Sequence, residues 1–165
     1  IKKLGVKYVI IGHSESRASG ENNIIIKEKV EIALKNKLTV ILCIGENKQE
    51  KRNKKTLMVL KTQISKVIKK KNNFKNIIIA YEPIWSIGTG RLPSRPELQK
   101  NITMLKRFIK NKFRITYNPK ILYGGSVDKN SIQTFKSIND LEGFLIGGAS
   151  KSSKNFIDII KNFYK

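Results

Sequence analysis

The chain has 165 residues, of which 39% are hydrophobic, so it is long enough to bury one core and too short for two. Its longest apolar runs are only a few residues, which excludes a membrane-spanning helix. The net charge of +22 raises the question of nucleic-acid binding, but 28 of the 34 basic residues are scattered lysines, whereas phosphate and base recognition favours arginine. We therefore expect solvated helix faces, no specific nucleic-acid site and no membrane partner.

The single cysteine, Cys43, cannot form an internal disulfide. The first residues also lack the continuous apolar segment of a secretory signal. Both features favour a reducing, cytoplasmic location. A buried, unreactive thiol is the simpler interpretation of Cys43, because no base or second cysteine lies beside it in the sequence.

Strands and helices are predicted to alternate along the chain. Short runs rich in Ile and Val, typical of strands buried on both faces, cover residues 8–11, 39–44, 77–81, 121–123 and 143–146. Helical patterns cover residues 24–36, 56–71, 96–111, 131–137 and 153–163, and Ser94 and Glu97 have the spacing of a reciprocal capping box. This alternation predicts an α/β fold with parallel strands. Without a linker or a composition break, residues 1–165 are expected to form a single domain.

Polar residues or glycines follow every predicted strand. They are His13 and Glu15, Glu46, Glu82, the run Gly124-Gly125-Ser126, and the pair Gly147-Gly148. Because the carboxyl ends of parallel strands meet on one face of a barrel or an open sheet, these residues are predicted to form one ligand site.

The segment after the third predicted strand is the most informative. Glu82 is followed by Pro83, by the apolar residues Trp85 and Ile87, and by glycines at 88 and 90. A carboxylate next to an apolar loop with flexible joints suits a base that a lid shields from water. The alternative is an ordinary buried loop.

The other signals are weaker when each is taken alone. A lone histidine such as His13 is more often structural than catalytic, and each glycine pair is as compatible with a plain turn as with an anion site. Together, two glycine pairs after successive strands favour backbone N–H groups left bare for an anion. Glu15 and Glu46 are interpreted as structural hydrogen-bonding groups. His, Cys and carboxylates are too sparse at ligand spacing to predict a metal site.

The motifs resemble the triosephosphate isomerase family in sequence, order and spacing, over essentially the whole chain. They are the runs at 8–15, 43–46, 81–90, 123–127 and 143–150. The resemblance implies a (β/α)₈ TIM barrel, interconversion of dihydroxyacetone phosphate and glyceraldehyde 3-phosphate, and no cofactor.

The resemblance also assigns roles. It implies that Glu82 is the base that removes the proton next to the carbonyl, and that His13 is the neutral electrophile that polarises this carbonyl. The phosphate is expected to bind backbone N–H groups of Gly88, Ser126, Gly147 and Gly148. Ile87 and Leu145 are expected to press over Glu82, and Tyr123 and Ser126 to hydrogen-bond the closed lid.

Two departures from the family pattern accompany these expectations. A complete barrel takes about 250 residues, and the first motif here matches the fourth barrel strand. We expect the chain to be the last five β-α units, without the first three, without the family's Asn-x-Lys segment and without its dimer loop. The full protein is then expected to be a homodimer, and the piece alone to be inactive. In addition, Ser16 and Asn22 replace a usual Arg–acid pair, and the end of the lid reads Arg91-Leu92-Pro93.

Two other functions remain open at this stage. A phosphate-binding half-barrel without chemistry explains the glycine pairs, but it gives His13 and Glu82 no role. A basic nucleic-acid-binding protein explains the charge, but none of the motifs at the strand ends.

Overall fold

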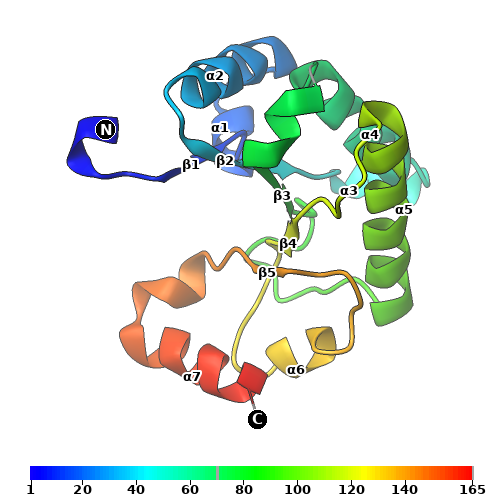
Figure 1. The fold of residues 1–165 in the computed structure, drawn as a ribbon. Helices are drawn as coiled ribbons and strands as arrows, with labels where there is room; N and C mark the ends of the chain where they lie inside the picture. The colour runs from blue at the N-terminus through cyan, green and yellow to red at the C-terminus, as the bar shows by residue number, and fades with distance from the viewer. Residues whose placement is uncertain (70, 165) are drawn as a thin grey trace.

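The computed structural model describes residues 1–69 and 71–164 of the chain. Five strands form one parallel sheet in the order in which they occur in the sequence, β1-β2-β3-β4-β5 (Figure 1). They are β1 (Tyr8–Ile11), β2 (Thr39–Ile44), β3 (Ile77–Tyr81), β4 (Ile121–Tyr123) and β5 (Gly143–Phe144). An unbroken parallel order of this kind is part of a TIM barrel, and it confirms the predicted fold class.

Helices connect successive strands and cover the outer face of the sheet (Figure 1). The longer ones are α2 (Asn23–Lys35), α4 (Thr56–Val67), α5 (Arg95–Phe113) and α7 (Ser153–Tyr164). The shorter ones are α1 (Ser14–Ala18), α3 (Lys48–Arg52), α6 (Ile132–Phe135) and the 3₁₀ turns η1 (Lys2–Leu4), η2 (Lys71–Asn76) and η3 (Gly148–Lys151). α2 packs beside α4, and α4 packs beside α5.

The core lies between the sheet and these helices. Val40, Leu42 and Ile79 of the central strands are fully buried, and so are Leu60 of α4 and Ile102 of α5. Each apolar side chain removed from water in this layer stabilises the fold by roughly 1.5–3 kcal/mol. This packing fixes the strand register, with Val40 opposite Ile77 and Cys43 opposite Ala80.

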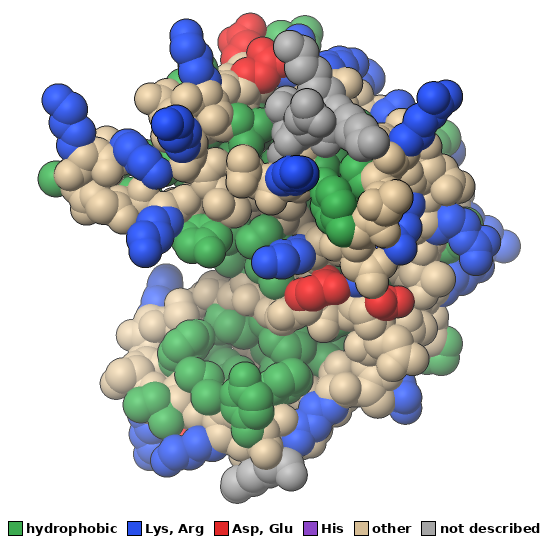
Figure 2. All heavy atoms as spheres, in the orientation of Figure 1, with side chains coloured by type: hydrophobic (Ala, Val, Ile, Leu, Met, Phe, Trp, Pro, Cys, Tyr) green, Lys and Arg blue, Asp and Glu red, His purple; other side chains and the backbone are tan. Residues whose placement is uncertain are grey.

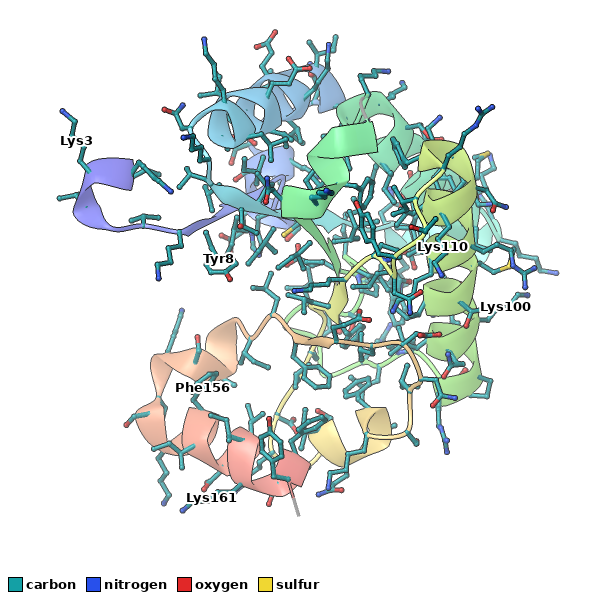
Figure 3. The ribbon with its side chains drawn as sticks, viewed as in Figure 1. Lys3, Tyr8, Lys100, Lys110, Phe156 and Lys161 are labelled. Atoms are coloured by element: carbon teal, nitrogen blue, oxygen red, sulfur yellow. The ribbon has the colours of Figure 1, made fainter. Side chains whose placement is uncertain are left out.

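The sheet does not close within the described part of the chain, because β1 and β5 each have one hydrogen-bonded neighbour there. Tyr8 and Ile10 on β1 are about half exposed, and Tyr8 points away from α2 (Figure 3). Phe156 and Ile160 on α7 are also exposed. Figure 2 shows hydrophobic side chains gathered on the inner side of the C-terminal half, whereas lysines and arginines are spread over the face shown.

Several predicted boundaries are wrong. The helix expected over 56–71 ends at Val67, and Lys70, which falls inside that range, lies outside the described residues. The fifth strand ends at Phe144 rather than at residue 146, because its partner β4 ends at Tyr123, which lies opposite Phe144. The helices α1 and α3 were not predicted. Only half of the capping box forms, since Ser94 accepts from the Glu97 N–H while the Glu97 carboxylate pairs with Lys51 at 3.0 Å.

Candidate active site

All six residues predicted to act on substrate line one cavity of about 300 Å³ at the carboxyl ends of the strands. They are His13, Glu82, Gly88, Ser126, Gly147 and Gly148. They come from the loops that follow β1, β3, β4 and β5, so the parallel topology brings together groups that are far apart in the sequence.

Glu82 and His13 face each other across this cavity. Oε1 of Glu82 lies 3.7 Å from Nε2 of His13. His13 is the N-cap of α1, and its Nδ1 accepts the Glu15 N–H at 3.4 Å. An accepting Nδ1 places the proton of a neutral imidazole on Nε2, the nitrogen that faces Glu82.

Glu82 is almost completely buried, with 3% of its surface exposed. Among the described residues, only two buried side-chain oxygens have no hydrogen-bond partner, Oε2 of Glu82 and Oε2 of Glu46. Burial raises the pKa of the Glu82 carboxyl, and the neighbouring His13 opposes that rise. A carboxylate with an unpartnered oxygen in a small cavity is a strong base toward a proton delivered there.

Two glycines leave the space that Glu82 needs. A Cβ at Gly45 would lie 1.8 Å from the Glu82 carbonyl oxygen, and a Cβ at Gly124 would lie 2.6 Å from its Cγ. The pair Gly124-Gly125 was interpreted above as bare N–H groups for an anion. The structure gives these glycines a different and sufficient reason, namely close packing against neighbouring side chains.

The three glycines predicted to bind the phosphate differ from Gly124 and Gly125. A Cβ at Gly88, Gly147 or Gly148 would have no heavy atom within 4 Å, so these positions border open space. Gly88 also has a φ of +67°, which favours glycine. Ile87 and Leu145 line the same cavity and give it an apolar wall beside Glu82.

The segment predicted as a lid, residues 83–93, is hydrogen-bonded to β4 and its following loop through Ser86 and Gly90. Ser126 Oγ donates to the Ser86 carbonyl at 2.5 Å and accepts the Gly90 N–H at 3.2 Å. The Tyr123 hydroxyl lies 3.0 Å from the Ser86 hydroxyl. Tyr123 and Ser126 thus contact the lid segment, as the family resemblance implies.

Glu46 holds the lid segment through a hydrogen bond with Trp85. Its Oε1 accepts the Trp85 indole N–H at 2.8 Å and the Tyr81 hydroxyl at 3.3 Å. Lys51 Nζ lies 3.3 Å from the centroid of the Trp85 ring and also pairs with Glu97. The structural role predicted for Glu46 therefore takes a specific form, because this residue fixes the only tryptophan of the chain.

Sequence reasoning missed two contributors, Arg17 and Ser86. Ser16 stands where the family usually has an arginine. The next residue, Arg17, contacts the backbone at two strand ends beside the site. Its guanidinium donates to the carbonyls of Gly12 at 2.8 Å and Cys43 at 3.0 Å. Asn22 does not pair with it and instead caps α2. No sequence signal separates a partly buried arginine from an exposed one.

Cys43 lies below Glu82 and is 1% exposed. Burial raises the pKa of its thiol, which agrees with the prediction of an unreactive side chain. Within residues 1–69 and 71–164, no group of three or more His, Cys, Asp and Glu is placed to hold a metal ion. No described helix is long and apolar enough to span a membrane.

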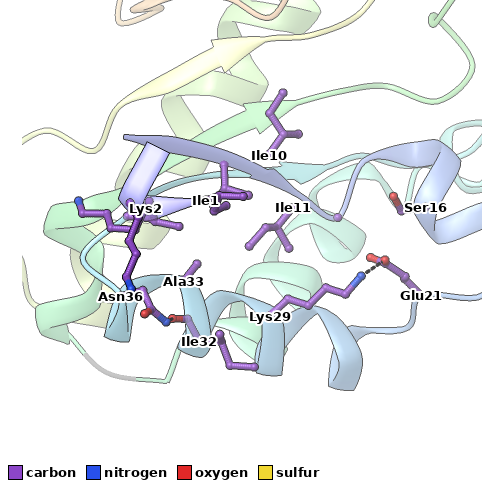
Figure 4. A pocket seen from close by; sticks show the side chains of 14 residues that line it. Ile1, Lys2, Ile10, Ile11, Ser16, Glu21, Lys29, Ile32, Ala33 and Asn36 are labelled. Atoms are coloured by element: carbon purple, nitrogen blue, oxygen red, sulfur yellow. Dashed lines mark hydrogen bonds and ion pairs between the residues drawn. The ribbon is translucent and has the colours of Figure 1, made fainter. Parts of the chain in front are cut away.

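A larger cavity, of about 670 Å³, lies elsewhere, between the N-terminal residues, β1 and α2 (Figure 4). It is lined mainly by aliphatic side chains such as Ile10, Ile11 and Ile32, with the Lys29–Glu21 ion pair at one side. None of the six predicted site residues lines it, so size alone does not identify the chemical site.

Comparison with known proteins identifies the family of the chain. The family model described as triosephosphate isomerase matches residues 1–163. Proteins named triosephosphate isomerase from Yarrowia lipolytica, Thermodesulfovibrio yellowstonii and Saccharomyces cerevisiae are 42%, 40% and 39% identical to it over 164, 167 and 165 residues. Each alignment covers 98% of this chain and 66% of the relative, so the chain spans slightly less than two thirds of their length. The chain belongs to the triosephosphate isomerase family.

Proposed function

We propose that the protein containing this chain is a triosephosphate isomerase, which interconverts dihydroxyacetone phosphate and D-glyceraldehyde 3-phosphate. The observation that carries the proposal is the opposition of Glu82 and His13 at 3.7 Å, with a free carboxylate oxygen, in a cavity bordered by bare glycines. This arrangement supports a base and a proton donor that act on neighbouring atoms of one small substrate.

The chemistry needs two proton movements. Glu82 takes the proton from the carbon beside the carbonyl. The electron pair of the broken C–H bond then forms the double bond of the enediolate. Nε2–H of His13 donates to the carbonyl oxygen as negative charge develops there. Return of the proton from Glu82 to the neighbouring carbon, with reprotonation of His13 by the other hydroxyl, completes an isomerisation with no net loss or gain of atoms.

The phosphate group is expected to lie against Gly88, Ser126, Gly147 and Gly148. Their positions on the cavity wall support this, because a side chain at three of the four would occupy the open space. Backbone N–H groups at Gly88, Gly147 and Gly148 would hold an anion without adding a competing charge. The Ser126 N–H already donates to Ser86 Oγ at 3.3 Å, so Ser126 would border the phosphate rather than supply a free N–H. Ile87 and Leu145 then exclude water, and this protects the intermediate from losing phosphate.

We further propose that the remaining β-α units, which correspond to the uncovered third of the relatives, complete the barrel, supply a cationic contact to substrate and form a homodimer in the cytoplasm. The exposed apolar residues on β1 and α7 support this, since Tyr8, Ile10 and Phe156 border the open sides of the sheet. Residues 1–165 alone are expected to be inactive, because five strands cannot enclose the substrate.

The test is isomerase activity of the full-length protein with and without its base. Glu82→Gln should lower kcat by about 10³-fold, because a general base contributes on that scale. Glu82→Asp should lower kcat while KM changes little, because the carboxylate is retained but withdrawn. Tight binding of a substrate analogue without turnover in the full-length protein would instead favour a phosphate-binding role. A residues 1–165 polypeptide that isomerises substrate would contradict the need for the remaining units.

A further inference from the structure

Ser86 lies in the lid segment, yet it is completely buried. Its hydroxyl donates to the Arg91 carbonyl at 2.5 Å and lies 3.0 Å from the Tyr123 hydroxyl. The backbone N–H of Ser126 donates to the same oxygen at 3.3 Å. A loop serine with three partners and no exposure is unusual, because most loop hydroxyls face water.

The hydrogen-bonding capacity of Ser86 is fully used. A serine hydroxyl has one proton and two lone pairs. The Arg91 carbonyl can only accept, so it takes the proton, and Tyr123 must then donate to Ser86 together with the Ser126 N–H. Burial raises the pKa of Tyr123 to about 12, so the phenol retains the proton that this arrangement requires.

The network joins parts of the lid that are separate in sequence. Ser86 belongs to its first half, whereas Gly90 and Arg91 belong to its last half, and both halves meet Ser126 on the loop after β4. Glycine at position 125 leaves the space that these hydrogen bonds need. A Cβ there would lie 2.2 Å from the Tyr123 hydroxyl and 2.7 Å from the Ser86 hydroxyl.

We infer that Ser86 is a positioning residue whose hydroxyl docks both halves of the lid segment on the β4 loop and so holds the lid over Glu82. It acts through Tyr123 and Arg91, while the neighbouring Ile87 and Gly88 line the cavity. The inference deepens the proposed isomerase function and rests on it for its catalytic consequence. Removing the hydroxyl leaves the buried Tyr123 proton and Arg91 carbonyl without this partner, and both then favour an undocked lid.

The first test needs no activity. Trp85 is the only tryptophan of residues 1–165 and precedes Ser86. Its fluorescence reports the lid directly once any tryptophan in the rest of the full-length protein is replaced by phenylalanine. In the full-length protein, Ser86→Ala should raise quenching of Trp85 by acrylamide several-fold in the absence of substrate. Acrylamide is neutral, so the basic surface does not bias its access. Ile79→Val, a core change in β3 away from the network, controls for general loosening and should leave quenching unchanged.

The second test measures function. Ser86→Ala should lower kcat and raise the inorganic phosphate released per isomerisation by about tenfold, because an undocked lid exposes the intermediate. Tyr123→Phe should have a similar effect, and the double variant should be no worse than either single one, since both remove the same junction. Ile79→Val should lower the melting temperature without changing the phosphate ratio.

Unchanged quenching in Ser86→Ala, additive effects in the double variant, or an equal rise in phosphate release in Ile79→Val would overturn the inference. Loss of the proposed function has a different signature, namely a wild-type protein without isomerase activity or a Glu82→Gln variant that retains it. In that case the acrylamide comparison still decides whether Ser86 docks the lid.

Discussion

Gly124 lies against Glu82 so closely that a methyl group on its Cα would be 2.6 Å from the Glu82 Cγ. The position of the Glu82 side chain therefore depends on the absence of a side chain at Gly124, in the loop after β4. Gly124 has no positive φ, so alanine pays no backbone penalty there, and any effect of adding a methyl must come from contact with Glu82.

Gly124→Ala should accordingly lower kcat by about 10²-fold, the scale expected when a catalytic group moves by about 1 Å. Kinetics and thermal unfolding of the full-length protein measure the effect. Gly5→Ala is the control for backbone strain without a clash, because Gly5 has a φ of +80° and open space around its Cα. That control should lower the melting temperature slightly with kcat unchanged. A Gly124→Ala enzyme within twofold of wild type would show that Glu82 is not held by this contact.

The buried carboxyl of Glu82 should also make stability depend on pH. Burial raises its pKa above the ordinary value of 4.5, so the folded state binds a proton more tightly than the unfolded state. The stability gained from the protonated form is complete below pH 4.5 and is lost as pH rises through the folded-state pKa. At neutral pH the ionised group therefore destabilises the fold.

Glu82→Gln should consequently raise the melting temperature near pH 7.5 and change it little near pH 4. Thermal unfolding of both proteins at the two pH values measures the difference. The comparison separates a buried charge from a simple change in packing, because packing effects do not follow pH. An equal shift at both values would indicate packing.

The contact between Lys51 and Trp85 offers a separate test of lid support. Lys51 Nζ lies 3.3 Å from the ring centroid and pairs with Glu97, and about a third of each charged side chain is exposed. Lys51→Met should therefore cost only about 0.5–1 kcal/mol of stability, while the Trp85 emission shifts as the cation leaves the ring. Lys51→Arg retains the charge and should keep more of the wild-type spectrum than Lys51→Met. Identical spectra for all three proteins would remove Lys51 from the support of the lid.

The strands and the shared position of His13 and Glu82 could be predicted because their signals are local and repeated. Runs of Ile and Val mark β1 to β4 to the residue, and the motifs after them place His13 and Glu82 on one face. The helix α3 was missed although Asn47 and Glu50 form a capping box that the sequence does display.

Other features depend on tertiary contacts that no local pattern encodes. Arg17 is recruited beneath the site by carbonyls of Gly12 and Cys43, from two different strand ends. Ser86 is an ordinary loop residue in the sequence and becomes a junction only when the β4 loop meets the lid. The need for glycine at position 124 is equally nonlocal. The side chain that would clash with a methyl group there is that of Glu82, on the loop after β3.

Lys106 on α5 forms ion pairs that are expected to stabilise the fold without contributing to the proposed chemistry. Its side chain is 7% exposed and pairs with Glu142 and, at 3.6 Å, with Asp140. The other oxygen of Glu142 accepts the Ile121 N–H at 2.6 Å, so the pair ties α5 to the start of β4.

Lys106→Met should lower the free energy of unfolding by about 1–3 kcal/mol and leave kcat unchanged, because Glu142 is partly exposed and is not left as a fully buried charge. Glu142→Gln should cost more than Asp140→Asn, since Glu142 alone also holds a strand N–H. Denaturant unfolding of the single variants and of the Lys106→Met/Glu142→Gln double variant measures the coupling. Simple addition of the two single effects would show that the ion pair contributes nothing of its own and that α5 is held on β4 by apolar packing alone.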